Sequence, residues 1–388
     1  MLLVINYIHK LQGLDKALPM CWELKRRCGA KIVTVIDLEA SARHDMGGLL
    51  ELTTQVSDEY IRLQEPGIPR GFHRRFFKRR AFQRQFAGLF SPQARPLMLA
   101  IYHGTNRPAG AALARLTKRN NGRRVGYLKS LHDQGRGLSD LRYRSKPLKK
   151  GKRNTYILLK NLDRFLTPDH GPFQSMLEEK GIPRSRQIVA GYPVCYASWH
   201  ELVKEMPRVR WLNAHRRALE VVVFTRGEAD HKVPEAQIIS DEWVLQAVRT
   251  IVERTRAINK ECRIRIKPHP YQNIDVLREG LADVPEIELT DDPPCILAAT
   301  ADLAIATYSS AILDAVAFGV PAIEYFEENR AFRQRHPDGS PFGQFGVVIA
   351  RNEPQFSEAM SAFAAEHSSG FELGKILGET LDVEALLR

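Results

Sequence analysis

The sequence is poor in cysteine and has no long uncharged stretch, and each shortage excludes a class of protein. Its five cysteines are odd in number and form no CxxC pair: Cys21, Cys28, Cys195, Cys262 and Cys295. Such spacing excludes a disulfide framework and a structural zinc site, and it is typical of a reducing cytoplasm. The least charged region, residues 295–326, is broken by Asp302 and Asp314, so it cannot supply the ~20 apolar residues of a membrane span. We therefore expect a cytoplasmic protein that is soluble or peripheral to the inner membrane.

Signatures of export and of common nucleotide-binding loops are also missing. The first residues, MLLVINYIHKLQG, have neither a basic lead-in nor a small-residue cleavage site. The chain contains no GxxxxGK[ST] stretch, and no GxGxxG follows the first predicted strand. These absences argue against an exported protein, against P-loop kinases and NTPases, and against dinucleotide-dependent dehydrogenases.

Acidic residues are scarce in one part of the chain. Residues 60–154 contain 24 lysines and arginines but 3 acids, a balance of +21 in a chain whose net charge is +12. The basic residues are densest in 71–86, where five phenylalanines are interleaved with arginines, and in 142–153. A solvated basic face would explain this, and so would docking to an anionic membrane surface or a phosphorylated acceptor. Nucleic acid ranks third as a partner, because no recognition module accompanies the charge.

Alternating strand and helix patterns run along most of the chain. In its first half we predict strands at Leu2–Asn6, Lys31–Ile36, Pro96–Tyr102, Arg124–Leu131, Tyr156–Leu159 with Arg164–Phe165, and Gln187–Ala190. Helices are predicted between them at Leu14–Arg27, Ala111–Arg119 and Phe173–Lys180. This alternation predicts a parallel sheet covered on both faces.

A second alternating series follows in the other half of the chain. Strands are predicted at Glu220–Phe224, Arg263–Lys267, Ile287–Leu289, Leu303–Ala306 and Ala322–Tyr325. Helices are predicted at Asp241–Asn259, Ile274–Leu281, Pro294–Ala299, Ser310–Phe318, Gln355–Glu366 and Phe371–Leu387. We predict an α/β protein with two doubly wound Rossmann-like domains, 1–193 and 216–388, joined by a linker at 194–215. The domains would face each other across a cleft that the carboxyl ends of their strands line.

Two short motifs stand at strand ends in the second domain. Tyr308, Ser309 and Ser310 follow one predicted strand, where their hydroxyls could cap a helix or their backbone N–H groups could hold an anion. His269 stands between two prolines at the end of another strand, in the stretch RIRIKPHPYQN. Alone, such a histidine can simply bond a neighbouring carbonyl. Because carboxyl ends of parallel strands share one sheet edge, His269 and Ser309 could also bind the same phosphate.

These motifs resemble the nucleotide-binding half of GT-B transferases that build bacterial surface polymers. The segments KPHP (267–270) and ADLAIATYSSAILDAVAFGVPAIEY (301–325) are similar to those of CDP-glycerol glycerophosphotransferases and capsule-type Kdo transferases, and to the HP and SS motifs of bacterial sialyltransferases. The stretch IVAGYPV (188–194) resembles a Gly-x-Pro element shared with UDP-sugar epimerases. The resemblance implies the GT-B fold, with an acceptor-binding first domain and a nucleotide-binding second domain.

The resemblance also implies which residues hold the donor. It implies that His269 contacts the donor phosphate and that Ser309 and Ser310 complete the phosphate site. The other residues that we assign to the donor site are Lys267, Pro270, Tyr308, Asp314, Thr225, Arg226 and Gly227. The FTRG step (224–227) ends a strand at the same edge, where an arginine could neutralise a leaving phosphate. A plain surface loop there is equally compatible with the sequence. Since no acidic cluster of the DxD type stands at a strand end, we expect no metal and no cofactor.

The catalytic base should come from the first domain. Two histidines follow predicted strands there, His103 in YHGT and His132 in LHDQGRG. We favour His132 because Asp133 could tune its imidazole toward neutral pH. Adjacent residues of an extended chain face opposite ways, so the pair could also be unrelated.

Together the motifs predict a metal-independent glycosyltransferase. It would move a sugar or sugar acid from a nucleotide donor, with CMP-Kdo or a CMP-sialic-acid-like sugar favoured, to a surface polysaccharide or lipid-linked anionic glycan. A CDP-polyol phosphotransferase and a UDP-sugar 2-epimerase are the alternative enzymes. An alternative of another class is a non-catalytic protein that binds polysaccharide or nucleic acid.

Overall fold

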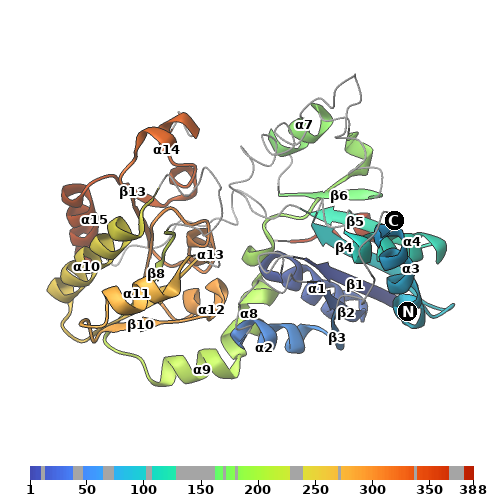
Figure 1. Ribbon diagram of the computed structural model, residues 1–388, viewed down its shortest axis with the longest axis horizontal. Coiled ribbons are helices and arrows are strands. Elements are labelled where there is room, and N and C mark those ends of the chain that lie inside the picture. Colours follow the sequence, from blue (N-terminus) through green and yellow to red (C-terminus); the bar gives the residue numbers. More distant parts are fainter. Residues whose placement is uncertain are drawn as a thin grey trace. The chain divides into compact units, whose positions relative to one another are not determined.

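The chain folds into two compact units, each built around one parallel sheet (Figure 1). The computed structural model describes residues 1–9, 14–37, 47–63, 74–101, 107–127, 162–168, 172–179, 182–227, 239–269, 272–335, 339–366 and 380–388. The first unit comes mainly from residues 1–199 and also includes the C-terminal residues 380–388. The second unit comes mainly from residues 200–366.

The first unit contains a 7-stranded sheet with the order β3-β2-β1-β4-β5-β6-β7. Its strands are β1 (Leu2–Ile8), β2 (Lys31–Ile36), β3 (Glu59–Arg62), β4 (Arg95–Ile101), β5 (Arg123–Tyr127), β6 (Arg164–Thr167) and β7 (Gln187–Val189). All neighbouring strands are parallel. Residues 3–8 of β1 are buried without a break, because a central strand of a parallel sheet is covered on both faces.

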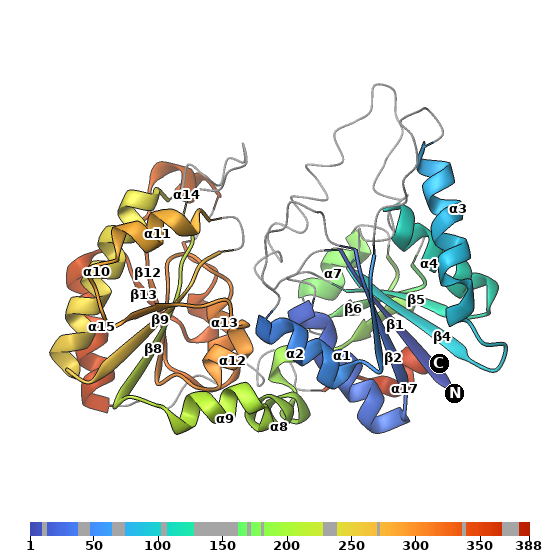
Figure 2. The same ribbon diagram turned by 60° about the horizontal axis from the view of Figure 1, so that its bottom comes forward.

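Helices cover both faces of the first sheet. They are α1 (Leu14–Cys28), α2 (Gly47–Val56), α3 (Arg74–Phe86), α4 (Pro108–Arg119) and α7 (Pro172–Glu179). Leu3 and Ile5 of β1 share a hydrophobic cluster with Phe82 and Phe86 of α3 and with Leu113 of α4. The helix α1 packs on the opposite face of β1 and β2, where none of its residues joins that cluster (Figure 2).

The second unit contains a 6-stranded parallel sheet with the order β10-β9-β8-β11-β12-β13. Its strands are β8 (Leu219–Phe224), β9 (Cys262–Lys267), β10 (Ile287–Leu289), β11 (Leu303–Ala306), β12 (Ala322–Tyr325) and β13 (Val348–Ala350). Its helices are α10 (Asp241–Ile258), α11 (Ile274–Gly280), α12 (Pro294–Ala298), α13 (Ile312–Ala317), α14 (Arg330–Arg335) and α15 (Glu353–Glu366). From the central strand β8 the chain adds β9 and β10 on one side, and it then adds β11, β12 and β13 on the other side. The sheet is therefore doubly wound.

The two faces of strand β9 have opposite chemistry, as the alternation RIRIK predicts. Ile264 and Ile266 lie in the main hydrophobic cluster of the second unit, with Val248 of α10 and Phe356 of α15. The arginines at 263 and 265 project to the other face, where both contact Glu220 of β8. Arg265 is fully buried there.

The structure confirms most predicted elements, often to within two residues, and corrects the domain division in two places. Residues 194–215, the predicted linker, form a short 3₁₀ turn and two helices, α8 (Ala197–Glu205) and α9 (Pro207–Ala214). The chain passes from the first unit to the second within α8. The elements α2, β3, α3, α14 and β13 were not predicted, because their short or basic sequences carry weak periodic patterns. Predicted strand residues 128–131 and 156–159 and helix residues 371–379 lie outside the described residues.

All five cysteines carry free thiols. Among the helices in the described part of the chain, none combines the length and the hydropathy that a membrane span requires.

The C-terminal helix α17 (Val383–Leu387) belongs to the first unit, whereas the sequence analysis placed it in the second domain. Two arginines at the amino ends of β4 and β5 donate to its last carbonyls. Arg95 Nη2 lies 2.6 Å from Leu387 O, and Arg123 Nη1 lies 3.3 Å from Leu386 O. The last carbonyls of a helix have no partner within the helix, and cations stabilise this end. Burial and the neighbouring Arg95 lower the pKa of Arg123.

We predict that Leu386→Ala lowers the free energy of unfolding of the first unit by about 2–5 kcal/mol, because the side chain of Leu386 is fully buried. Denaturation in guanidinium, followed by circular dichroism, should show the transition of the first unit shifting alone. The control Arg388→Ala removes a side chain that is 80% exposed and should change stability by less than about 0.5 kcal/mol. A shift confined to the transition of the second unit would contradict the placement of α17.

Candidate functional site

Three chain segments leave the second sheet at one line along its carboxyl edge. The parallel register sets Phe224 of β8 beside Lys267 of β9 and beside Ala306 of β11. The predicted donor segments therefore begin side by side: residues 225–227 after β8, 268–269 after β9 and 307–310 after β11. Neighbouring strands lie about 4.8 Å apart, so the ends of β9 and β11 are separated by roughly 10 Å with the β8 segment between them.

Hydrogen bonds join the three segments to one another. The Thr225 hydroxyl donates to the Gln272 side-chain oxygen at 2.8 Å, and the backbone N–H of Gln272 donates to the His269 carbonyl at 2.8 Å. On the other side, the backbone N–H of Arg226 donates to the Thr307 hydroxyl at 3.0 Å. Thr225 and Thr307 are almost fully buried, which makes these bonds costly to break. The segments are thus held as one assembly.

Tyr308 adopts a backbone conformation that a tyrosine rarely occupies. Its φ of 59° lies in the left-handed region, which costs a residue with a side chain of order 1–2 kcal/mol. The ring is 3% exposed and stacks on Phe326, with the ring of Phe332 edge-on. This packing holds the strained residue in place. The guanidinium of Arg226 lies 5.4 Å from the centre of the same ring, so Tyr308 also positions Arg226.

Gly227 lies in close contact with two polar side chains where the β8 segment turns. A Cβ added there would lie 1.8 Å from Asp241 Oδ1 and 2.6 Å from Gln272 Nε2. A side chain at this position would therefore displace the side-chain ends of Asp241 and Gln272. The FTRG step is a tightly packed turn, which argues against the alternative of a plain surface loop.

The two serines do not cap the following helix with their side chains. Helix α13 begins at Ile312, later than predicted, and its first turn shows no bond from a capping side chain. Instead, the backbone carbonyls of Ser309 and Ser310 accept from Ile312 and Leu313 at 3.2 Å. Ser309 is buried and Ser310 half-buried. The N-cap position of α13 is Ala311, so neither serine occupies the position of a capping hydroxyl.

The other predicted donor residues are placed as follows. His269 is half-buried at the end of β9. The Lys267 ammonium donates to the Asp291 carbonyl at 3.0 Å, so the turn after β10 anchors it. Asp314 is buried within α13. Pro270 lies outside the described residues. Among the described residues, no three His, Cys, Asp or Glu side chains are grouped as metal ligands.

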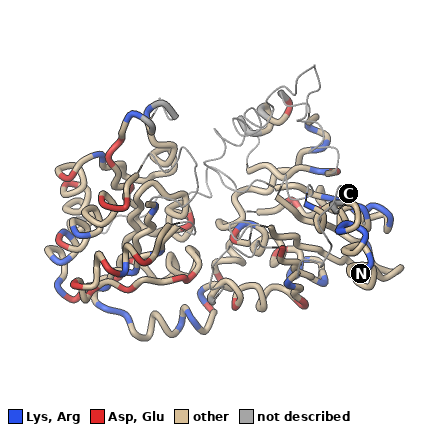
Figure 3. Tube along the Cα trace, in the orientation of Figure 1, with Lys and Arg blue, Asp and Glu red and all other residues tan. Residues whose placement is uncertain are grey.

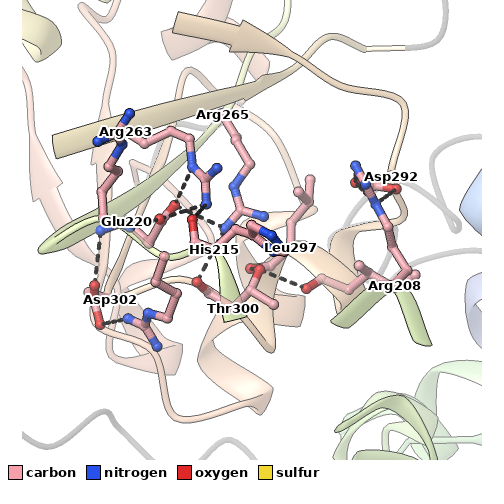
Figure 4. A network of polar contacts seen from close by, with 12 residues as sticks. Arg208, His215, Glu220, Arg263, Arg265, Asp292, Leu297, Thr300 and Asp302 are labelled. Carbon is pink, nitrogen blue, oxygen red and sulfur yellow. Dashed lines mark hydrogen bonds and ion pairs between the residues drawn. The ribbon is translucent and has the colours of Figure 1, made fainter. Parts of the chain in front are cut away.

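A buried ion network lies on the polar face of β8 and β9 (Figure 4). The carboxylate of Glu220 is fully buried and accepts from Arg263 at 2.8 and 3.0 Å. Arg265 Nη2 lies 3.4 Å from the same carboxylate and 3.2 Å from the Thr300 carbonyl. Burial lowers the pKa of Arg265, although the charge of Glu220 opposes this shift. The network ties β8 to β9 below the candidate site.

Asp302 extends this network to β11. Its carboxylate accepts from the backbone N–H of Glu220 at 2.9 Å, and its own N–H donates to the Glu220 carbonyl at 2.8 Å. Arg216 Nη2 lies 2.5 Å from the other carboxylate oxygen of Asp302. Because Asp302 directly precedes β11, these bonds fix the register of β11 against β8. The same register sets the positions of the three donor segments.

The predicted catalytic residues His103, His132 and Asp133 lie outside the described residues, as do residues 142–153.

The structure does show a titratable cluster at the carboxyl edge of the first sheet that the sequence analysis missed. His9 follows β1 and stacks on Tyr7, with ring centres 6.1 Å apart. Tyr7 donates to Asp37, which follows β2, and Arg107 Nε lies 3.1 Å from the same carboxylate. Burial, followed by the charge of Asp37, raises the pKa of Tyr7.

The sequence contains one signal for this cluster, which is the position of two of its residues. His9 follows a predicted strand by three residues and Asp37 follows one directly, much as His269 follows its strand by two. Their partners Tyr7 and Arg107 are brought together only by the order β2-β1-β4 of the sheet.

A small pocket with a cavity volume of about 40 Å³ lies further along the same edge, at the ends of β5, β6 and β7. Its lining is mostly apolar and includes Tyr127, Thr167 and Gly191. The buried ammonium of Lys16, from α1, donates to the Tyr192 hydroxyl at 2.5 Å. The glycine of the predicted Gly-x-Pro element, Gly191, has a φ of 64° and forms part of this wall.

Two doubly wound parallel units within one chain define the GT-B fold class, as the sequence predicts. No protein-family model matches the chain, and no curated protein matches it. Solved structures do match it by fold. The UDP-GlcNAc 2-epimerase from Neisseria meningitidis bound to UDP-GlcNAc shares 12% identity over 100% of both chains, with a TM-score of 0.59.

Two further structures show the same fold. The S. aureus MnaA–UDP structure has 12% identity and a TM-score of 0.58, covering 100% of this chain and 94% of that one. Phytolacca americana UGT2 complexed with UDP-2fluoro-glucose and pterostilbene has 10% identity and a TM-score of 0.53, covering 100% and 93%. At identities of 10–12% these matches show the fold alone.

We predict that Glu220→Gln destabilises the second unit by about 3–5 kcal/mol, because it leaves the positive charges of Arg263 and Arg265 without their carboxylate. Chemical denaturation measures this loss. The matched control is Asp283→Asn, which removes the partner of Arg249 in a solvent-exposed pair and should cost about 1 kcal/mol or less. Equal effects of the two variants would refute the structural role of the network.

Proposed function

We propose that the chain is an enzyme that acts on a nucleotide-activated sugar and that its second unit binds the phosphates of that nucleotide. The observation that carries the proposal is the alignment of residues 225–227, 268–269 and 307–310 at one sheet edge. Ligands of open parallel sheets bind at the carboxyl ends of the strands. A histidine, an arginine and two serine hydroxyls are suitable donors for phosphate oxygens.

The strain at Tyr308 supports the same location. Residues in the left-handed region cluster at ligand sites, because the surrounding packing holds them in spite of the cost. Here the strained residue stands between the buried Thr307 and the two serines, and its ring contacts Arg226. In the proposed complex, Arg226 balances the phosphate charge and His269 donates to a phosphate oxygen from the opposite side of the β8 segment.

Uridine is now favoured over cytidine as the nucleoside. The three solved structures described above contain UDP, UDP-GlcNAc or UDP-2fluoro-glucose. CMP-Kdo and CMP-sialic-acid-like donors, which the sequence analysis favoured, gain no support from them. Asp314, buried in α13 one turn after the serines, is our candidate for a contact to the nucleotide's sugar.

The comparisons favour a UDP-sugar 2-epimerase over a transferase to a surface polysaccharide. Several of the matching structures are UDP-GlcNAc 2-epimerases, and the plant glycosyltransferase shows that the same fold also supports transfer. Transfer to an anionic or lipid-linked glycan, with the first unit as the acceptor domain, is the second candidate. The basic residues of the first unit favour this candidate, because they suit an anionic acceptor.

Both reactions need a group that moves a proton, and we propose that it comes from the first unit. His132 with Asp133, and His103, are the candidates from the sequence. His9 joins them because it is held at the end of the central strand beside Tyr7 and Asp37.

We predict that UDP binds more tightly than CMP or CDP, and that His269→Ala weakens UDP binding by about tenfold or more, as expected for a lost bond to a charged group. Isothermal titration calorimetry measures both, with Arg249→Ala as a control on the far helix α10. Unchanged affinity in the histidine variant would remove His269 from the site. Tight RNA binding without nucleotide preference would instead support the non-catalytic alternative.

The reaction type can be tested with UDP-GlcNAc alone. We predict that NMR shows conversion to the C2 epimer without an acceptor, and that His132→Ala, His103→Ala and His9→Ala, made singly, identify the proton-transfer group by a fall in kcat of about 10²–10⁴ with UDP binding retained. If UDP is released only when a glycan acceptor is added, the chain is a transferase. No turnover under either condition would contradict the proposal of an enzyme.

A further inference from the structure

The helix α3 buries one face and presents aromatic rings on the other. Lys78, Phe82 and Phe86 are spaced by four residues and are buried, the two phenylalanines in the core of the first unit. On the opposite side, Phe76 is 45% and Phe77 52% exposed. Large apolar side chains are seldom left in water in neighbouring pairs, so these two phenylalanines require an explanation that the core does not supply.

Exposed positive charge continues along the helix pair from the two rings. Arg80 and Arg84 are exposed one and two turns after Phe76 on the same face of α3. The helix α4 packs directly against α3, and its Arg115, Lys118 and Arg119 are exposed. Figure 3 shows basic positions in blue in the region of these two helices. We define the α3–α4 surface as these five basic residues together with Phe76 and Phe77.

No acid balances this charge nearby in the sequence. Between Glu65 and Asp133 the chain has no aspartate or glutamate. Elsewhere in the described residues exposed arginines often pair with acids, as Arg249 does with Asp283 and Arg254 with Glu353. The α3–α4 surface therefore projects a positive field that attracts anions.

We propose that the α3–α4 surface docks on an anionic lipid bilayer, with Phe76 and Phe77 inserted at the level of the headgroups. Basic side chains beside a membrane are attracted to anionic lipids, and aromatic rings settle in the interface. The surface provides both kinds of contact on one helix pair. This inference does not depend on the proposed nucleotide site, which lies in the other unit.

A lipid surface fits these rings better than a nucleic acid does. Stacking of bases needs an open aromatic face. The guanidinium groups of Arg79 and Arg80 already lie 5.8 and 5.4 Å from the centre of the Phe76 ring, and Phe77 contacts the same ring edge-on at 5.8 Å. The face of Phe76 is thus partly occupied by its own neighbours, whereas insertion between headgroups requires only exposed apolar ring atoms.

The test is co-sedimentation of the full chain with vesicles of equal parts phosphatidylcholine and phosphatidylglycerol, compared with pure phosphatidylcholine vesicles. We expect binding to the anionic vesicles alone, weakened by salt. The double variant Arg80→Gln/Arg84→Gln should lower the partition coefficient by roughly 30-fold. The double variant Phe76→Ser/Phe77→Ser should also lower the partition coefficient, and the size of this loss should not depend on the salt concentration.

Matched controls are available in the second unit. Arg249→Gln/Arg254→Gln removes two exposed helix arginines, and Trp211→Ser removes a side chain that is 49% exposed. Both should leave the partition coefficient unchanged. An equal loss of vesicle binding in the variants of the α3–α4 surface and in the control variants would overturn the proposal. So would an absence of binding to anionic vesicles. Binding to single-stranded RNA that depends on Phe76 and Phe77, without vesicle binding, would assign the surface to nucleic acid instead.

Discussion

The second unit depends most on the ion pairs that the buried carboxylate of Glu220 makes with two arginines. This carboxylate compensates two arginines of β9, one of them fully buried, while the backbone of the same residue exchanges hydrogen bonds with Asp302 before β11. A buried charge of this kind tolerates few alternative arrangements, because any shift in register would separate ions that water cannot reach. The order β9-β8-β11 and its register are thereby fixed.

The candidate donor site follows from that register. The register pairs Phe224 with Lys267 and with Ala306, so the segments that follow these three residues begin next to one another. Gln272 and Thr307 therefore each span only one strand spacing in their bonds to the β8 segment. The strain of Tyr308 is held by aromatic packing next to this assembly. Rigid placement of polar groups is what binding of a charged phosphate requires, because little entropy remains to be lost when the ligand binds.

Arginine serves three distinct purposes in this chain. Arg265 neutralises a buried acid, Arg95 and Arg123 hold the carbonyls of the C-terminal helix, and Arg80 and Arg84 of α3 face solvent. Charge counting along the sequence treats them alike. Only their contacts show which part of the basic surplus is internal and which part, on α3 and α4, is exposed to solvent.

The sequence by itself determined the fold class, most strand positions and the sheet edge that carries His269 and Ser309, because period-two and period-3.6 patterns and strand-end motifs are local signals. Tertiary structure decided the rest. RIRIK predicts two faces, but the burial of Arg265 beside Glu220 and the Thr300 carbonyl depends on tertiary contacts. The left-handed Tyr308, the return of α17 to the first unit and the meeting of His9, Tyr7 and Asp37 depend on contacts between residues distant in sequence. A pattern read along one strand cannot contain them.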